Sequence, residues 1–297
     1  MKEIQAHYAD LVKEYRGQYE RARLDNPDEY TANYFRLQHI LQVLPKFDVK
    51  RILDAGCGEG SPMVQLLKSG YDVRGFDFVP EMVQGAKKLL TENSYDENLA
   101  CWGDITDLIT FSHLRDDQPF DAVISLGVLP HVENEILVLK NLNAQLKTGG
   151  IAIIEFRNEL FDMFALNRPS YKFYMKELFS SVQELPEDVA ATITRDIEQR
   201  FKMQFPIIKE NNPGSDAPSY DVILAKKHNP FTVDSFFKAA GFEFVTNAFY
   251  HYHPYPPYYR DLDKKMFQTL SHKLEHENSG WKGPFMASAF VTVAVKS

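Results

Sequence analysis

The sequence predicts an α/β protein built on a parallel β-sheet, and three observations support this fold class. From Lys50 onward, short apolar runs alternate with helical stretches, which is the pattern of successive βαβ units. The runs are continuously apolar, as expected for strands that helices cover on both faces. The first run ends in a glycine-rich turn at Gly56 that opens a helix, and such turns bind ligands at the carboxyl edge of α/β sheets.

The composition is that of a globular protein, with 44% hydrophobic and 25% charged residues among 297, and one elaborated domain is the simplest organisation. No apolar run approaches the roughly 18 residues of a membrane helix. The first residues also lack a secretory signal, so we expect a cytoplasmic protein with no membrane partner. Two cysteines are too few for a disulfide framework or a zinc cluster. A net charge of −8 argues against nucleic acid as a partner.

Residues 1–48 are predicted to form an N-terminal helical segment. Apolar residues recur at helical spacing from Ile4 to Tyr15 and again from Tyr34 to Leu44. The polar segment 26–28 separates the two stretches, which therefore indicate two amphipathic helices.

The core of the sheet is expected at 49–158. Its five predicted strands are Arg51–Ala55, Val73–Asp77, Leu99–Trp102, Ala122–Leu126 and Ile151–Phe156. After the first strand, Ser61 is expected as an N-cap and Pro62 as the first helical residue. A turn over 146–150 is expected before the fifth strand.

Two insertions are predicted after the fifth strand. The segment 159–228 is interpreted as a cap with a helix at 189–201, because it is too long for a plain loop. The remainder, 229–297, resumes the core and contains an aromatic-rich insertion at 250–287. Its predicted elements are a helix at Thr232–Ala240 ended by Gly241 and strands at Phe242–Thr246 and Ser288–Val295.

The turn after the first strand predicts a nucleoside-containing cofactor. It reads Asp-Ala-Gly-Cys-Gly-Glu-Gly from Asp54 to Gly60, and glycines such as Gly56 and Gly58 let the backbone approach a ligand closely. About 20 residues further on, Asp77 ends the next apolar run, where an acidic residue can accept both ribose hydroxyls.

The details of this turn distinguish between cofactors. A dinucleotide fingerprint would place its third glycine at position 61, where this chain has Ser61, and it has no counterpart of Asp54. The motif instead resembles the first motif of the class I S-adenosylmethionine-dependent methyltransferases. The resemblance implies a Rossmann-like fold, S-adenosyl-L-methionine as cofactor and S-adenosyl-L-homocysteine as product.

The resemblance continues in order over 50–156 and again over 230–249. It implies Asp77 on the ribose, Phe78 beside the adenine, Asp104 on the adenine amino group and the Ile105 backbone near the ring. Asp54, Gly56 and Gly58 belong to the cofactor turn. The stretch 120–127, which includes Leu126, looks like the fourth strand of the family, which leads into the methyl-transfer site.

His131 follows this fourth strand and is the first candidate for a general base, because imidazole titrates near neutral pH. A hydroxyl acceptor benefits from such a base, whereas alignment with the methyl group does most of the catalysis. A structural role at the start of the following helix accounts for His131 equally well. In this family, N-terminal helices often fold over the cofactor, so Tyr8 or Tyr15 is expected either to close the pocket or to face the core.

Two further clusters are candidates for contact with the acceptor. Arg157 and Asn158 end the fifth strand and suit an anionic or hydroxylated substrate, with salt bridging inside the cap as the alternative. His251, Tyr252 and His253 lie in the aromatic-rich insertion, where alternation places both histidines on one face. These histidines are candidate bases or part of a wall on which a sugar stacks, while packing of the insertion onto the cap is the alternative. No metal is expected, because spacing supplies no third ligand.

The sequence thus predicts an O-methyltransferase acting on a small molecule such as a sugar or a natural product. An N-methyltransferase and a non-catalytic cofactor-binding scaffold are the alternatives. The tetrapeptide of amino-group nucleic-acid methyltransferases is missing after the fourth strand, which reads Ser125-Leu-Gly-Val-Leu-Pro. The segments 156–161, 228–230 and 251–257 faintly resemble bacterial methyltransferases of surface-polysaccharide sugars.

Overall fold

The computed structural model describes residues 2–28, 31–179, 182, 184–201, 208–276 and 280–297. It divides into two compact units. The first comprises Met1–Arg157, Lys209–Ala248 and Phe290–Ser297, and the second comprises Asn158–Ile208 and Phe249–Ala289. The segment expected as one cap, 159–228, is therefore shared between the units. Within the described residues, no helix is both long enough and apolar enough to cross a bilayer.

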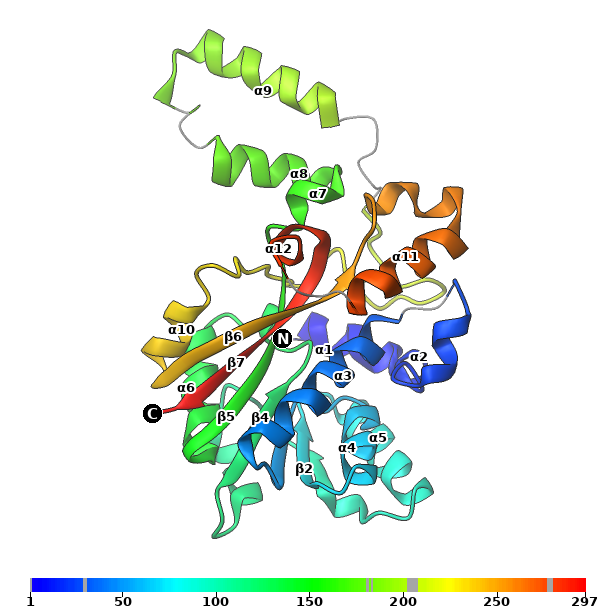
Figure 1. Cartoon of the computed structure of the whole chain (residues 1–297), viewed down its shortest axis with the longest axis vertical. Helices are drawn as coiled ribbons and strands as arrows, with labels where there is room; N and C mark the ends of the chain where they lie inside the picture. The colour runs from blue at the N-terminus through cyan, green and yellow to red at the C-terminus, as the bar shows by residue number, and fades with distance from the viewer. Residues whose placement is uncertain (1, 29–30, 180–181, 183, 202–207, 277–279) are drawn as a thin grey trace. The chain divides into compact units, whose positions relative to one another are not determined.

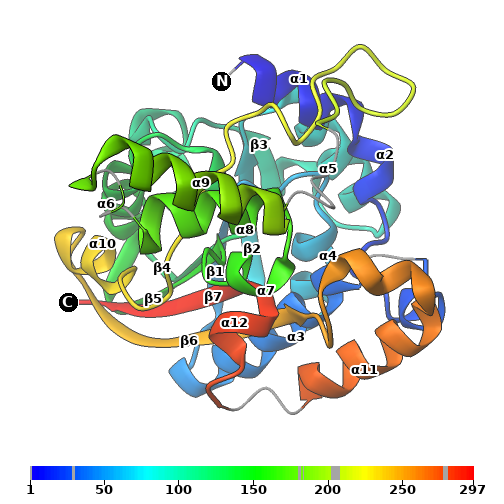
Figure 2. The ribbon, with the colours of Figure 1, turned by 90° about the horizontal axis from the view of Figure 1, so that it is seen from above.

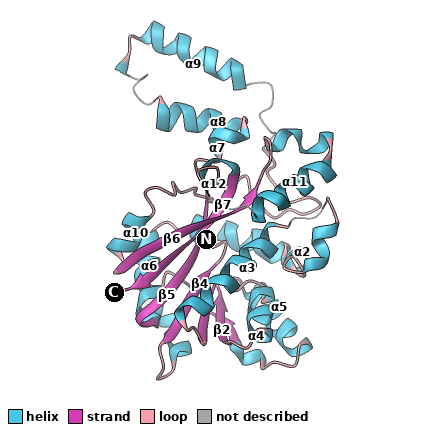
Figure 3. Ribbon diagram, in the orientation of Figure 1, coloured by secondary structure: helices cyan, strands magenta, loops and turns pink. Residues whose placement is uncertain are grey.

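A seven-stranded sheet is the framework, in the order β3-β2-β1-β4-β5-β7-β6. Figure 3 draws its strands in magenta. Its strands are β1 (Arg51–Ala55), β2 (Asp72–Asp77), β3 (Ala100–Trp102), β4 (Phe120–Ser125), β5 (Leu146–Arg157), β6 (Phe242–Tyr252) and β7 (Ala287–Lys296). The first five strands pair in parallel, whereas β7 runs opposite to β5 (Figure 1). The predicted α/β fold is confirmed, with a mixed rather than wholly parallel sheet.

Helices of the first unit cover both faces of the sheet, with α6 and α10 on one side and α3 and α4 on the other (Figure 2). Its helices are α1 (Lys2–Asp10), α2 (Val12–Tyr15), α3 (Ala32–Val43), α4 (Ser61–Lys68), α5 (Pro80–Glu92), α6 (Glu135–Gln145) and α10 (Asp234–Ala239). Those of the second unit are α7 (Asp162–Ala165), α8 (Arg168–Phe173), α9 (Glu187–Phe201), α11 (Lys264–His276) and α12 (Gly283–Met286). This coverage explains the continuously apolar strands, because both faces are removed from water.

Two local expectations are wrong. Residues 146–150 form the beginning of β5 rather than a turn, since Leu146 pairs with Phe120 before a shift of register in this part of the β4–β5 pairing. Ser61 is already helical, and the N-cap position is Gly60 at a φ of 88° with no side-chain cap bond. The Glu59 carboxylate accepts a hydrogen bond from the Ser61 N–H at 3.2 Å. It thereby pairs one of the first amides of α4, which have no partner within the helix.

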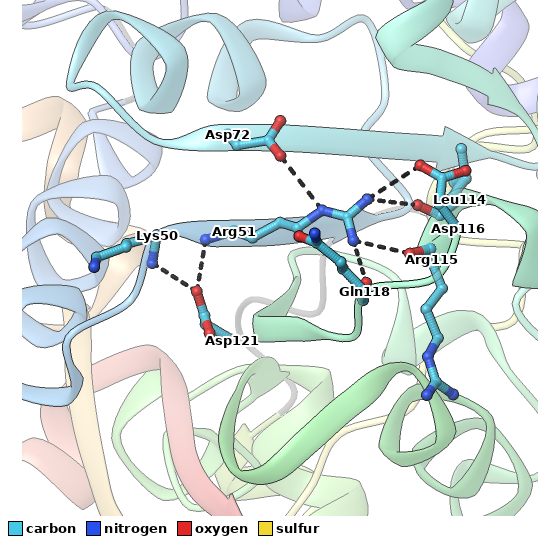
Figure 4. Close-up of polar contacts among 8 residues, drawn as sticks. All are labelled: Lys50, Arg51, Asp72, Leu114, Arg115, Asp116, Gln118 and Asp121. Carbon is cyan, nitrogen blue, oxygen red and sulfur yellow. Dashed lines mark hydrogen bonds and ion pairs between the residues drawn. The ribbon is translucent and has the colours of Figure 1, made fainter.

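The amino edge of the sheet is fixed by a polar network around Arg51 and Asp121 (Figure 4). The Asp121 carboxylate accepts from the backbone N–H groups of Lys50 and Arg51 at 2.9 and 2.8 Å. The Arg51 guanidinium donates to backbone carbonyls of Leu114 and Arg115 and lies 4.6 Å from the Phe120 ring centroid. These bonds anchor the starts of β1 and β4, and so set where both strands end at the opposite edge.

Candidate functional site

The glycine turn after β1 lies where the carboxyl ends of β1 and β2 meet. The backbone N–H groups of Gly56 and Cys57 both donate to the Phe76 carbonyl, at 2.8 and 2.9 Å. Gly56 has a φ of +83°, and a Cβ there would lie 2.2 Å from Cγ2 of Val128. Gly58 has a φ of +56°, but its Cβ would meet no described atom within 4 Å. The glycine at 56 is thus required by packing, whereas the glycine at 58 faces open space.

Asp77 closes the turn from the neighbouring strand. One carboxylate oxygen accepts from the Gly58 N–H at 2.8 Å and the other from the Val79 N–H at 2.8 Å. Burial raises the pKa of Asp77, and the two backbone bonds oppose that rise. Each oxygen keeps a second lone pair, so the residue is held in position and can still accept hydroxyl groups.

Asp54 is buried at the end of β1, and neither of its carboxylate oxygens has a hydrogen-bond partner among the described residues. Burial, followed by repulsion from Asp77, raises the pKa of Asp54 to about 7, against the attraction of Arg36. A buried carboxylate without a partner is unfavourable. Such an acid is suited to receive a cationic group from a ligand.

Arg36 on α3 is a site residue that sequence reasoning missed. Its guanidinium forms a buried ion pair with Glu155 of β5 and a hydrogen bond with the Tyr19 hydroxyl. The signal in the sequence is an arginine inside the apolar run Phe35–Leu37, on a helix whose buried residues include all three positions. A buried arginine requires a charged partner or ligand, and Glu155 is that partner here.

The residues expected around an adenine lie at the ends of β2 and β3. The Phe78 ring centroid is 6.3 Å from that of Trp102, whose indole N–H donates to the Phe78 carbonyl. One Asp104 oxygen accepts from the Thr106 N–H and hydroxyl. Ile105 is buried and its carbonyl accepts from Asn141. These positions border one edge of the sheet, and their contact with a cofactor stays a prediction.

His131 follows β4 and the buried Leu126 in the chain, and it is itself buried at the end of a short 3₁₀ helix, Leu129–His131. Nδ1 of His131 bonds to the Leu224 carbonyl, and Nε2 lies 2.7 Å from the Tyr8 hydroxyl. Burial lowers the pKa of His131, so the ring is neutral near pH 7. Both ring nitrogens of His131 are therefore already bonded, and its role as a general base stays a prediction.

Arg157 lies at the end of β5 in the same unit. Its guanidinium carbon is 5.7 Å from the Tyr220 ring centroid, and the Tyr220 ring is 5.8 Å from that of His131. Tyr220 was not predicted, because the segment 209–228 has no helical or strand pattern that would place it. The cluster joins a cation and aromatic rings beside His131.

Asn158 begins the second unit and is committed to its packing. The side-chain amide donates to the carbonyls of Pro284 and Ala287, both at 2.7 Å, and its oxygen accepts from the Leu160 N–H. The residue is 1% exposed. These bonds give Asn158 a structural role in the second unit. They do not support the expected role of Asn158 in substrate binding, which stays a prediction.

His251 and His253 lie together in the second unit, with ring centroids 4.6 Å apart. Their proximity does not come from strand alternation, because His251 has a φ of 60° and β6 ends at Tyr252, before His253. Nδ1 of His251 contacts the Ser288 hydroxyl at 2.6 Å. Burial lowers the pKa of His253 to about 4, and its ring packs on Phe161 and Phe267.

Ser271 and Glu275 of helix α11 form hydrogen bonds with the backbone of Tyr252, between the two histidines. The Glu275 carboxylate accepts from the Tyr252 N–H at 2.8 Å, and the Ser271 hydroxyl donates to the Tyr252 carbonyl. Burial raises the pKa of Glu275 to about 8 and that of Tyr252 to about 12. Glu275 was missed by sequence reasoning, because an acid on an amphipathic helix is usually solvated.

Comparison with known proteins identifies relatives of this chain. Residues 46–227 match a family described as methyltransferase domain. The ubiquinone biosynthesis O-methyltransferase of Rickettsia bellii (strain OSU 85-389) is 32% identical over 133 residues, covering 43% of this chain and 52% of that protein. The protein of that name from Actinobacillus pleuropneumoniae serotype 5b (strain L20) is 26% identical over 157 residues, covering 52% and 66%. The chain thus spans about half the length of the first of these relatives.

Solved structures share the fold at low identity. A putative sarcosine dimethylglycine methyltransferase from Galdieria sulphuraria is 13% identical, with a TM-score of 0.51 over 90% of this chain and 87% of that one. An S-adenosylmethionine-dependent methyltransferase from Clostridium acetobutylicum ATCC 824 is 10% identical, with a TM-score of 0.50 over 89% and 92%. The family match and these likenesses confirm the predicted family and fold.

Proposed function

Because the chain belongs to the methyltransferase domain family, we propose that it binds S-adenosyl-L-methionine and transfers the methyl group to a hydroxyl of a small molecule. Two relatives named as O-methyltransferases favour oxygen as the acceptor atom. The expected likeness to sugar methyltransferases has no counterpart among these relatives. The absence of nucleic acid as a partner and the cytoplasmic location stay predictions.

The observation that carries the proposal is the buried carboxylate of Asp54 beside the open space at Gly58. Asp54 lacks a hydrogen-bond partner among the described residues, and Gly58 leaves room that a side chain would fill. The Asp54 carboxylate suits the ammonium group of an amino acid, whereas Arg36 already has Glu155 as its charged partner. Asp77 would accept the ribose hydroxyls of an adenosyl amino acid, which supports the proposal.

The bound cofactor supplies a sulfonium methyl group that is already activated, so the protein's task is to orient the acceptor and exclude water. Phe78, Asp104 and Ile105 would hold the adenine end, and Leu126 would border the reacting end. His131 follows the carboxyl end of β4, and Arg157 is the last residue of β5 in the same unit. A neutral imidazole can take the proton of a hydroxyl acceptor, and Arg157 would orient an acidic or hydroxylated one.

Titration calorimetry with S-adenosyl-L-methionine tests the cofactor site, and release of S-adenosyl-L-homocysteine tests transfer. We expect binding by the wild type, weakened at least tenfold in Asp54→Asn, and product release with a hydroxylated member of a panel of phenols, catechols and sugars. The absence of binding would contradict the proposal. Binding without product release from any panel member would favour the scaffold alternative, and release with amines alone would favour N-methylation.

The role of His131 is tested by replacement with alanine. We expect the methyl-transfer rate to fall by about 10²-fold or more, as is typical for loss of a general base, with the affinity for cofactor retained. An unchanged rate rejects His131 as part of the proton path. His251→Ala and His253→Ala test the second pair of histidines in the same assay, and unchanged rates there would reject both as bases.

A further inference from the structure

The Tyr8 hydroxyl lies on the proton-accepting nitrogen of the candidate base. Tyr8 is on α1, and its Oη is 2.7 Å from Nε2 of His131. The two rings meet edge to face with centroids 5.4 Å apart. An acceptor hydroxyl therefore cannot bond directly to Nε2 unless Tyr8 moves away.

The bonds of His131 determine which atom donates. Nδ1 faces the backbone carbonyl of Leu224, and because a carbonyl only accepts, Nδ1 must carry the proton. Nε2 of the neutral ring is then the acceptor, and the Tyr8 hydroxyl donates to it. The structure thus fixes one tautomer and leaves a lone pair of the Tyr8 oxygen as the outermost acceptor of the pair.

Groups from several elements act on this pair. Burial has the largest effect and lowers the pKa of His131; Arg157 and His7 lower it further, whereas the Leu224 carbonyl and Glu155 raise it. Burial raises the pKa of Tyr8 most, and Tyr15 and Tyr220 raise it further. Arg157 lowers the pKa of Tyr8, and Glu155 raises it. The same Leu224 carbonyl is bonded to the Nδ1–H of a protonated ring, so the imidazolium keeps a partner when it forms.

We propose that Tyr8 is a catalytic residue that relays the proton of the acceptor hydroxyl to His131. This inference rests on the proposed O-methyl transfer. As the acceptor oxygen forms its bond to the methyl carbon, the carbon–sulfur bond breaks and its electron pair stays on sulfur. The acceptor proton moves to Tyr8 Oη, the proton of Tyr8 moves to His131 Nε2, and the resulting imidazolium later releases one proton to solvent.

The two proton movements must be coupled. Burial raises the pKa of Tyr8 well above its ordinary value, so a separate tyrosinate is strongly disfavoured. Handing a proton to His131 while receiving one avoids that species. The relay also predicts that hydroxyl acceptors depend on Tyr8 more than amine acceptors do. A neutral amine can attack the methyl group before it loses its proton, whereas a hydroxyl gains more from a base.

The resting geometry can be tested without an acceptor. The full chain is labelled with ¹⁵N in its histidine rings, saturated with S-adenosyl-L-homocysteine and studied by NMR from pH 6 to 8. We expect His131 to be neutral at pH 7.5 with the proton on Nδ1, and the Nε2 signal to shift in Tyr8→Phe. A proton on Nε2, or signals unchanged by Tyr8→Phe, would overturn the relay.

The catalytic step is tested with catechol as the probe acceptor. We expect Tyr8→Phe to lower kcat by at least tenfold while the KM for S-adenosyl-L-methionine stays within twofold. Tyr34→Phe on α3 is the matched control, and its kcat should equal that of the wild type. A wild type that methylates catechol, but no faster than Tyr8→Phe does, overturns the relay, as does an effect on KM alone. If the wild type methylates another hydroxylated panel member instead of catechol, that compound serves as the probe. Failure of the proposed function is distinct, since it appears as a wild type that does not bind the cofactor in calorimetry or that binds it and methylates no hydroxylated panel member.

Discussion

At the scale of single residues, a comparison of Gly58 with Gly149 distinguishes the conformational cost of a side chain from its effect on ligand binding. Both have positive φ values, +56° and +74°, and a Cβ on either would meet no described atom within 4 Å. They differ in place, because Gly58 is in the turn after β1 and Gly149 is near the start of β5. An alanine at either position therefore has a similar conformational cost.

We expect Gly58→Ala to lower the affinity for S-adenosyl-L-methionine by at least tenfold, since its methyl group enters the space left for the ligand. Gly149→Ala should leave the affinity unchanged. Both should lose about 1 kcal/mol of stability, as a left-handed conformation of a non-glycine residue requires. Calorimetry and thermal unfolding provide the two readouts, and equal affinities in the two variants would contradict a ligand at Gly58.

Asp54 sets function against stability. Its folded pKa of about 7 lies above the unfolded value near 3.8, so its contribution to stability is greatest at low pH and is lost as pH rises through 7. We expect Asp54→Asn to raise the melting temperature at pH 8 relative to the wild type and to reduce cofactor affinity. Melting curves at pH 5 and 8 check the sign: a stabilisation at pH 5 larger than that at pH 8 would contradict it.

At the scale of elements, the Arg51–Asp121 network makes β1 and β4 a single anchored pair. The Asp121 side chain is 16% exposed, against 51% for Asp72, which also pairs with Arg51. Partial burial tends to raise the pKa of Asp121, but the bonds from Lys147 and the two backbone amides outweigh it and lower the pKa. Its stabilisation is therefore present above pH 4 and is lost as pH falls below that value.

We expect Asp121→Ala to destabilise the protein by about 1–3 kcal/mol, because two strand amides lose a charged acceptor. Asp72→Asn, a change in an exposed ion pair, should cost less than about 1 kcal/mol. Denaturant unfolding at pH 7 measures both, and cofactor affinity should be unchanged. Equal losses for the two variants would show that burial of Asp121 contributes nothing.

Elements were predictable where one local pattern decides them. The bounds of β1 agree with the prediction because a buried strand is a continuous apolar run with polar neighbours. The start of β5 was missed because Gly149 and Gly150 are typical of a turn, while the pairing of Leu146 with Phe120 depends on the shift of register. The Arg36–Glu155 pair joins residues 119 positions apart, so no local pattern relates them.

For the whole molecule, buried acids dominate the expected pH dependence above neutrality. Glu275, with a folded pKa of about 8, and Asp54, with one of about 7, both lie above their unfolded values. The folded chain therefore holds protons that the unfolded chain has lost, and stability falls as pH rises through this range. His253, with a pKa of about 4, contributes the opposite slope, but only below its unfolded value near 6.5.

We expect the melting temperature to fall from pH 6.5 to pH 8.5 and the slope to flatten in Glu275→Gln, which keeps an oxygen that can accept from Tyr252. Thr269→Ala, which changes a side chain on the same helix that does not ionise, provides the control, with no change of slope. Scanning calorimetry in buffers of equal ionic strength makes the comparison. A slope retained in Glu275→Gln would contradict the role of that carboxylate.

The position of β7 in the sheet has a consequence during synthesis. β7 lies between β5 and β6 but follows both in the sequence. When a ribosome has produced β5, about 130 further residues must emerge before its neighbour arrives, which takes several seconds at ordinary elongation rates. During that time one edge of β5 exposes unpaired backbone N–H and C=O groups, so the nascent chain is exposed to aggregation and benefits from chaperones.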